Sequence, residues 1–363
     1  MKIFLILSFS AAIIICLPYK INITFPATNI EKPGDELFES NEVLNIKLSG
    51  DLRELFNDRN DNAKYHSIIL SYTDKDNSLI SIPVRSKTRG NFRRKLGDCI
   101  YPPIWLDFSE NKNLQTSLFK GQVRLKLVMP CRGDEYVIRE YLLYRLYNLI
   151  TEKSFLARLV RIETENVKGK KKTDAFYGIL LEEDQQMAKR NHCVLVKRNM
   201  LPMQNTEQDA FLKMAVFEYL IGNTDWAVEV QQNIRLLAKD SLGIPAPVPY
   251  DFDHAGLVNA PYALPAEELQ MSSVRERRYR GYCIKDIKQF ESVITFYNKL
   301  KKDIYTLYTN FPLIDAKYLK SALQYLDEFY NTINNAKKLQ TEFGYPCLLN
   351  GTGNIIVKGM KEN

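Results

Sequence analysis

The sequence has no basic or acidic arm, and it lacks the nucleophile and phosphate-loop motifs of several large enzyme classes. Its 363 residues include 50 Lys and Arg against 43 Asp and Glu, and the net charge of +7 is spread along the chain. A nucleic-acid partner is therefore not expected. The absence of a P-loop and of a Gly-x-Ser-x-Gly elbow excludes Walker-type NTPases and serine hydrolases. With 45% hydrophobic and 26% charged residues, the chain should fold around a core.

Long apolar runs are also missing, apart from one at the start of the chain. Residues 3–17 are mostly apolar and follow a single lysine, which is the pattern of a signal peptide. The run is shorter than the ~20 apolar residues that a membrane-spanning helix needs. We therefore expect residues 1–17 to be removed, residues 18–42 to form a tether, and the mature protein to be exported to the periplasm or exterior of a bacterium, with no transmembrane span. A lipid anchor through Cys16 is the alternative.

Five cysteines follow the signal segment. None forms a Cys-x-x-Cys pair, so a zinc knuckle is not expected. Export makes disulfides permissible. Cys99 and Cys131 each lie beside a strand-like segment of what we predict to be one sheet, and we expect a bond between them. Two free, buried thiols are the alternative.

Hydrophobic periodicity divides the rest of the chain into a β-rich part, 43–184, and a mainly helical part, 185–343, followed by a tail, 344–363. In the first part, short runs of strand-like pattern predict strands. These strands are expected at 44–48, 65–72, 79–85, 104–108, 123–129, 157–165 and 175–183. One helix, 136–150, interrupts them. The second part is predicted to contain helices at 206–222, 286–310 and 315–337.

Acidic and amide side chains gather around one hairpin in the helical part. Asp225 follows the helix that ends at Gly222, Asn233 opens the next strand, and the return strand ends in Asp251 and Asp253. Protein kinases have the same order: an Asp that orients the acceptor hydroxyl, an Asn on Mg²⁺, and a metal-binding Asp. Hard oxygen ligands and one positioned carboxylate are most of what phosphoryl transfer requires of a protein. The loop between Asp225 and Asn233 is longer than in ordinary eukaryotic kinases, and no His-Arg precedes the Asp, so that class is excluded.

This order resembles the spore-coat protein H (CotH) kinase-like family, a secreted, atypical branch of the kinase fold. The family pattern reads here as Asn223, Asp225, Asn233 and Tyr250-Asp251-Phe252-Asp253. Upstream residues match in the same order: Arg89-Gly90-Asn91, the basic residues Arg93, Arg94 and Lys95, then Lys126, Arg139-Glu140 and 177–182. The resemblance covers residues 80–256.

The resemblance implies an α+β, bilobal protein-kinase-like fold, with a β-rich N-terminal lobe that holds one prominent helix and a mainly helical C-terminal lobe. It implies a kinase that transfers a phosphoryl group from ATP, with Mg²⁺ or Mn²⁺, to an acceptor that the sequence does not identify; protein hydroxyls are one candidate. Asp225 would position the acceptor, and Asn233, Asp251 and Asp253 would hold the metal ion. Lys126 would meet the phosphates with Glu140 as its partner. The residues implied to bind nucleotide are Arg89, Gly90, Lys126, Glu140 and Glu182.

Other functions remain open from the sequence. A non-catalytic, kinase-like surface or binding protein would keep such a scaffold without the activity. A metal-dependent hydrolase would use Asp251, Asp253 and His254, but the three histidines of the chain show no metal-ligand spacing. For Lys126 and Glu140 the alternative is an ordinary surface position. The basic run 275–280 is expected to be a solvated segment.

Overall fold

The computed structural model describes residues 36–97, 99–111, 114–168, 173–349 and 355–356. The predicted signal segment 1–17, with Cys16, and most of the tether and tail lie outside these residues. All described residues belong to one unit, Pro33–Asn363. Among its described helices, none combines the length and the apolar character that crossing a bilayer demands.

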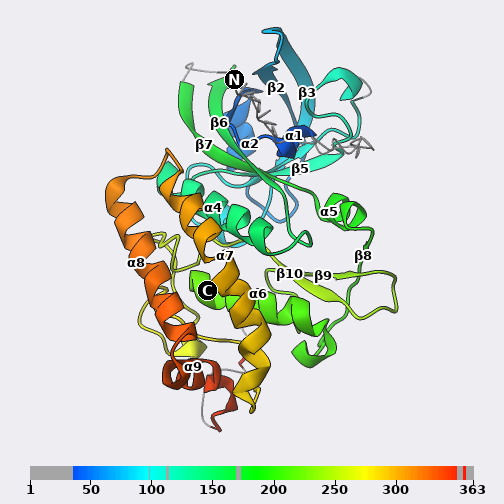
Figure 1. Ribbon diagram of the computed structural model, residues 1–363. Coiled ribbons are helices and arrows are strands. Elements are labelled where there is room, and N and C mark those ends of the chain that lie inside the picture. The colour runs from blue at the N-terminus through cyan, green and yellow to red at the C-terminus, as the bar shows by residue number, and fades with distance from the viewer. Residues whose placement is uncertain (1–35, 98, 112–113, 169–172, 350–354, 357–363) are drawn as a thin grey trace, which may run out of the picture. The chain divides into compact units, whose positions relative to one another are not determined.

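Seven strands in the N-terminal half of this unit close into a barrel (Figure 1). They are β1 (Leu44–Gly50), β2 (His66–Thr73), β3 (Leu79–Thr88), β4 (Ile104–Asp107), β5 (Arg124–Val128), β6 (Ala157–Asn166) and β7 (Thr173–Leu181). Their order around the barrel is β1-β2-β3-β4-β5-β7-β6. β1 pairs with β6 in parallel, from Leu44 opposite Val160 to Gly50 opposite Asn166. The other pairs are antiparallel.

The barrel interior is filled by the apolar residues that alternate along the strands. In β2, for example, Ile68, Leu70 and Tyr72 are buried while their neighbours face outward. Each such side chain contributes about 1.5–3 kcal/mol when it leaves water. The hairpin to β3 turns where the sequence predicts it, with Asn77 at a φ of +66° and its N–H donating to the Asp74 oxygen.

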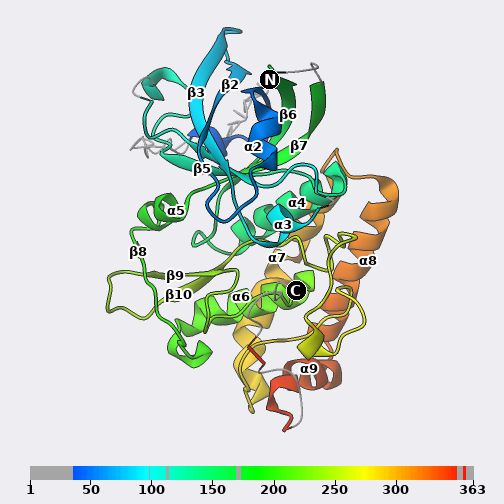
Figure 2. The same cartoon turned by 180° about the vertical axis from the view of Figure 1, so that it is seen from behind.

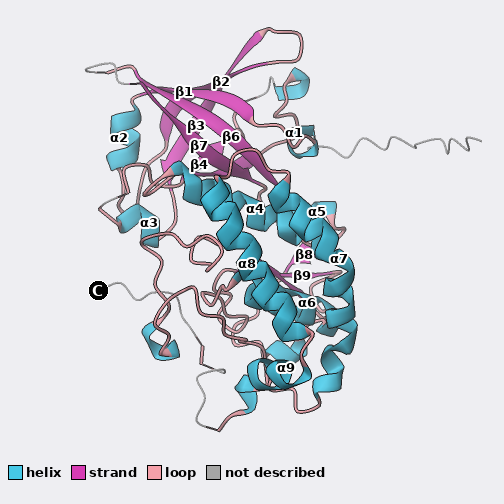
Figure 3. Ribbon diagram, turned by 60° about the vertical axis from the view of Figure 1, so that its left-hand side comes forward, coloured by secondary structure: helices cyan, strands magenta, loops and turns pink. Residues whose placement is uncertain are grey.

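Helices and a small second sheet make up most of the remaining structure (Figures 1 and 3). The helices are α1 (Glu36–Glu39), α2 (Leu52–Asn57), α3 (Phe92–Lys95), α4 (Asp134–Ile150), α5 (Asp184–Arg190), α6 (Gln208–Ile221), α7 (Glu291–Thr309), α8 (Ala316–Ile333) and α9 (Ala336–Phe343). The second sheet has the order β10-β9-β8, formed by β8 (Val194–Leu195), β9 (Ile234–Ala238) and β10 (Ala246–Pro249).

The helix predicted at 136–150 is confirmed as α4, and it is buried on both of its faces. It contacts β6 and β7 of the barrel on one side and α6 and α7 on the other. Ile138 and Leu142 are buried, and so are Glu140 and Tyr144 on the opposite face. Figure 2 shows the short helix α3 beside α4. The charged side chains of the candidate site lie in this region.

The prediction of a bilobal, protein-kinase-like fold is wrong. The strands of the β-rich part form a closed, seven-stranded barrel with mixed pairing, and nine helices accompany it within the described residues. Helices are also not confined to the second half, because α1 to α5 precede β8. Alternation along a strand shows which residues face the core, but not which edges pair. The parallel pairing of β1 with β6, which closes the barrel, therefore has no local signal.

The predicted disulfide between Cys99 and Cys131 is confirmed, with Cα atoms 4.3 Å apart, so the alternative of two free thiols is wrong. A second bond, Cys283–Cys347, joins residues 64 apart in the sequence and was not predicted. In the described part of the chain Cys193 is the free cysteine.

Candidate functional site

The turn after α6 places Asp225 beside Asn233. Gly222 ends the helix with a φ of +69°, and a Cβ there would lie 2.1 Å from the Tyr325 hydroxyl oxygen, so glycine is required on both counts. Asn223 Oδ1 then accepts a hydrogen bond from the N–H of Asp225 (3.1 Å). Asn233 Nδ2 donates to Asp225 Oδ2 (2.9 Å) and to the Asp225 backbone oxygen (2.8 Å). The predicted acceptor-positioning carboxylate and one predicted metal ligand are thus in direct contact.

Two of the predicted metal ligands have left-handed backbones. Asn233 has a φ of +50° and Asp251 a φ of +65°. Such conformations cost about 1–3 kcal/mol each and are found at functional sites more often than elsewhere. The Tyr144 hydroxyl of α4 accepts a hydrogen bond from the N–H of Asp251 (3.0 Å) and so helps to hold the second of them. The strain indicates that the positions of these two side chains are specified by the fold.

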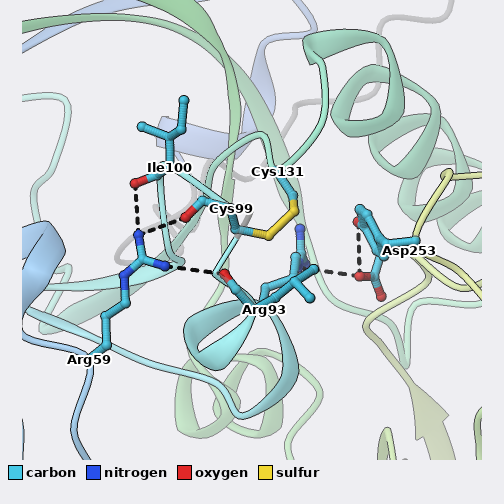
Figure 4. The surroundings of a disulfide bond; sticks show 8 residues. Arg59, Arg93, Cys99, Ile100, Cys131 and Asp253 are labelled. Atoms are coloured by element: carbon cyan, nitrogen blue, oxygen red, sulfur yellow. Dashed lines mark hydrogen bonds and ion pairs between the residues drawn. A yellow bond between two sulfur atoms is a disulfide. The ribbon is translucent and has the colours of Figure 1, made fainter.

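Arg93 of α3 connects three carboxylates that come from other elements. Its NH2 atom lies 3.3 Å from Asp251 Oδ1 and 3.7 Å from Glu140 Oε2, and its Nε lies 3.3 Å from Asp253 Oδ2. Figure 4 shows the side chain of Arg93 directed at Asp253. The Tyr262 hydroxyl donates to the same Asp253 oxygen (3.1 Å). The two predicted metal-binding aspartates therefore share one guanidinium.

Burial and neighbouring charges shift the pKa values of these acids. Burial raises the pKa of Glu140 to about 8, against the opposing effect of Arg93. Burial also acts to raise the pKa of Asp253, but Arg93 and His254 outweigh it and leave that pKa below its ordinary value. The pKa of Asp225 is raised, first by burial and then by the nearby aspartates. A carboxyl group with a raised pKa is a better proton acceptor at neutral pH.

A second charged cluster surrounds Lys126 of β5. Lys126 is 1% exposed and forms an ion pair with Asp184 at the start of α5. Arg235 Nε of β9 lies 2.6 Å from the other oxygen of Asp184. The Lys126 Nζ also lies 4.8 Å from the ring centre of Phe155 and 5.0 Å from that of Tyr250. Arg235 stacks on the same Tyr250 ring, and Tyr250 directly precedes Asp251 in the chain.

The predicted partner of Lys126 is not the one that the structure shows. Lys126 pairs with Asp184, whereas Glu140 lies with Arg93. Burial lowers the pKa of Lys126 to about 8, and the attraction of Asp184 limits this decrease. Burial would raise the pKa of Asp184, but Lys126 and Arg235 reduce it to about 2. Neither Lys126 nor Glu140 is an ordinary surface residue, since both are 1% exposed.

Arg89 and Gly90 directly follow the last residue of β3, and they lie near Lys126. The Arg89 guanidinium stacks on Trp105, with 4.9 Å from its central carbon to the ring centre, and its charge interacts with those of Asp251 and Lys126. Gly90 has a φ of +80°, and a Cβ there would meet no atom within 4 Å. Backbone conformation, rather than crowding, therefore explains this glycine.

Glu182 is held by protein groups. It is buried, and its two oxygens accept hydrogen bonds from Arg190 Nε (3.0 Å) and NH2 (2.9 Å). The N–H of Leu156 donates to it as well (3.0 Å). These contacts tie the end of the barrel to α5, so Glu182 has a structural role.

Metal-ligand chemistry by a His-containing set has no support in the geometry. Within the described ranges, no three His, Cys, Asp or Glu side chains converge as a metal-binding group. His254 is buried, and its ring packs edge-on against Phe92 (5.3 Å between ring centres) and Tyr262 (5.9 Å). Asp251 and Asp253 meet Arg93 instead.

The basic run 275–280 is not the solvated segment that we expected. Arg280 is 1% exposed, and its guanidinium donates to the backbone oxygens of Thr224 and Trp226, on either side of Asp225. It also donates to the oxygen of Ile355. The sequence pattern singled out neither Arg280 nor Arg235 as a site residue. The aromatic Tyr279, which is fully buried beside Arg280, was the available signal that this end of the run is buried.

A scan of the sequence against protein families gives no match, and a search of curated proteins gives none either.

Proposed function

We propose that this protein binds ATP with Mg²⁺ or Mn²⁺ and transfers its terminal phosphoryl group to an acceptor hydroxyl, with protein hydroxyls as one class of acceptor. The observation that supports this best is the proximity of a cationic and an acidic cluster. Lys126 and Arg235 both contact the ring of Tyr250, which directly precedes Asp251 in the chain, and the charge of Arg89 interacts with that of Asp251. Phosphates need cations and a metal ion needs carboxylates, so this pairing suits a metal–nucleotide complex.

The cationic side fits phosphate oxygens. Arg89 stacks on an aromatic ring, which leaves the edge of its guanidinium group available for hydrogen bonds, whereas Arg235 stacks on Tyr250 and already contacts Asp184 through its Nε. Lys126 has a pKa of about 8 because it is buried, and an added phosphate charge would favour its protonated form. Binding of a phosphate here would therefore relieve part of the cost of burying the lysine.

The acidic side fits a divalent cation. Carboxylate and amide oxygens are the hard ligands that Mg²⁺ and Mn²⁺ prefer, and one oxygen of Glu140 is buried without a hydrogen-bond partner in the described structure. Asn233, Asp251 and Asp253 would hold the ion, which when bound neutralises charge on the transferring phosphate. Asp225, held by the Asn233 amide and with a raised pKa, is suited to accept the proton of the acceptor hydroxyl.

The contact of Arg93 with Asp251 and Asp253 favours a second candidate, a non-catalytic ligand-binding protein. In that case the guanidinium would hold these aspartates permanently, and no metal ion would bind them. The two candidates differ in turnover and in metal dependence.

Two alanine variants test the proposal. Asp251→Ala should weaken ATP binding in the presence of Mg²⁺ at least tenfold, since it removes a ligand of the ground-state complex. Asp225→Ala should leave binding within about threefold and reduce ADP formation on the order of 100-fold, because a positioned proton acceptor acts in the transition state. Asp240→Ala is the matched control, because Asp240 is exposed in the turn of the same hairpin.

Calorimetry gives the binding constants and an ADP assay gives the turnover. ATP binding that does not depend on the metal ion and is unchanged in Asp251→Ala, with no turnover in the wild-type protein, would support the non-catalytic candidate. Failure of the wild-type protein to bind ATP with either metal ion would refute the proposed function.

We also propose that the protein is exported. Residues 1–17 motivate this, and the two disulfides are compatible with an oxidising compartment. N-terminal sequencing of protein recovered from outside the inner membrane of its host should find a start beyond residue 17, and an intact Met1 would contradict the proposal.

A further inference from the structure

The guanidinium of Arg93 contacts three carboxylates that come from two segments. Glu140 comes from α4, and Asp251 and Asp253 follow β10. Arg93 is 7% exposed, Glu140 1% and Asp253 6%, so water does little to compensate their charges, whereas the side chain of Asp251 is 42% exposed. Arg93 contacts all three acids, and the charge of Arg89 acts on Asp251 as well. The two buried acids, Glu140 and Asp253, therefore share the guanidinium of Arg93 with Asp251.

Glu140 provides a second, independent sign that the cluster is incomplete. Its Oε2 faces Arg93, but its Oε1 is buried and has no hydrogen-bond partner among the described residues. Leaving a buried acceptor unsatisfied costs about 1–3 kcal/mol, and more for a charged group. A bound cation would supply what this oxygen and the two aspartates lack.

Building on the proposed function, we propose that Arg93 occupies the place of the divalent cation in the metal-free protein and that Mg²⁺ or Mn²⁺ must displace its side chain from Asp251 and Asp253. In the absence of metal, the guanidinium of Arg93 is then the cation that contacts the aspartates. The guanidinium neutralises the aspartates until a metal ion binds. The apparent metal affinity then reflects the free energy of binding the metal ion minus that of the Arg93 contacts which it replaces. The displaced guanidinium remains close to the phosphate side of the site, where Arg89 lies.

The backbone that carries Arg93 is fixed, so the exchange requires only a movement of the side chain. Arg59 donates to the backbone oxygens of Leu96 (3.3 Å) and Cys99 (2.6 Å), just after α3. Cys99 is bonded to Cys131, which shortly precedes α4, and Figure 4 shows this disulfide next to Arg93. Both the α3 segment and the start of α4 are thereby anchored. Because its backbone is anchored, the long side chain of Arg93 can move away from the aspartates while the surrounding segments keep their fold.

The first test measures Mn²⁺ binding to the full, nucleotide-free protein by calorimetry. Arg93→Ala removes the competitor and should bind Mn²⁺ at least tenfold more tightly than the wild-type protein. Arg93→Lys, whose ammonium cannot form the same fork of contacts, should lie between the two. Arg94→Ala is the matched control, since Arg94 is buried on the same short helix but pairs with Asp61, and it should change Mn²⁺ affinity less than twofold.

Two results of this test are decisive against the proposal. If Arg93→Ala and Arg93→Lys bind Mn²⁺ no more tightly than the wild-type protein, Arg93 is a structural brace and not a competitor. If no variant binds Mn²⁺, the acids do not form a metal site. Should Arg93→Ala be unfolded alone but fold when Mn²⁺ is added, the metal replaces the guanidinium and the proposal is supported.

A second test uses the wild-type protein and does not depend on any variant. Phenylglyoxal modifies accessible arginines, and mass spectrometry locates the products. Arg93 should be protected in the metal-free protein and become reactive when Mn²⁺ is added, while Arg94 should not change. Equal protection of Arg93 with and without bound Mn²⁺ would overturn the displacement. Neither test uses ATP, so both can fail while nucleotide turnover stands, and both can succeed while turnover is absent.

Discussion

Replacing Lys126 with methionine should remove a pH-dependent part of the protein's stability. Lys126 has a pKa of about 8 in the folded protein because it is buried, against an ordinary value of 10.5. Between these two pH values the unfolded chain holds the proton more strongly, so this group makes the folded state more stable as the pH rises. The full difference corresponds to about 3 kcal/mol, of which about 2 kcal/mol is gained between pH 7 and pH 9.5.

At pH 7 the Lys126→Met variant should be about as stable as the wild-type protein. The substitution removes the ion pair with Asp184, but Arg235 stays on that carboxylate, and the methionine would pack against Phe155 and Tyr250. Replacement of a buried charged group by an apolar one of similar volume is often neutral or stabilising. The difference between the two proteins should therefore appear only as the pH is raised.

Urea denaturation at pH 7 and pH 9.5 measures this effect as a difference between two free energies of unfolding. Other lysines cancel in the comparison. Lys87→Met, on strand β3 of the same barrel, controls for the loss of a sheet lysine. The wild-type protein should become more stable relative to Lys126→Met by about 2 kcal/mol. Equal pH dependence of the two proteins would refute the reasoning from burial. Under the proposed function, Lys126→Met should also weaken ATP binding.

Three further substitutions test other features. Loss of the Cys283–Cys347 bond in a double serine variant should cost about 4 kcal/mol of unfolding free energy in the loop-entropy treatment, and an equal effect of reductant on both proteins would contradict this. Arg280→Met should remove the guanidinium that donates to three backbone carbonyls, and it should lower both the melting temperature and ADP formation, the latter at temperatures where the variant is still folded. Gly222→Ala should destabilise the fold by more than about 1 kcal/mol, because alanine disfavours the positive φ of this position and its Cβ would collide with Tyr325; a neutral thermal melt would show that the turn can relax.

Local pattern predicted the elements that depend on neighbours in the sequence. The two-residue period of β2 and the turn residues before β3 specify a hairpin, and the helical spacing of α4 is confirmed. The sequence predicted that Asp225 and Asn233 would lie together because both flank the same short segment, and the structure shows a hydrogen bond between them. The Cys99–Cys131 bond was predicted correctly from the neighbouring strands.

Features that join distant segments escaped prediction. Arg93 meets Asp251 across 158 positions of sequence, and nothing near either residue indicates the other. Lys126 pairs with Asp184 and not with the predicted Glu140. The direction of a side chain on a strand depends on how the sheet curves, and the sequence does not show that curvature. The prediction of a solvated segment was wrong for Arg280, which donates to backbone carbonyls. A run of arginines in the sequence does not show whether their hydrogen bonds go to water or to the protein.

The parallel pairing of β1 with β6 sets an order of assembly during synthesis. β1 emerges early and can pair with β2 at once, but its other edge has no partner until Ala157–Asn166 has been made. At about 5–20 residues per second, that edge waits on the order of ten seconds. An unpaired strand edge is a template for pairing with other chains. The nascent protein therefore passes through an interval of aggregation risk that ends when the barrel closes, and agents that bind exposed strands should improve its yield only if they act before that point.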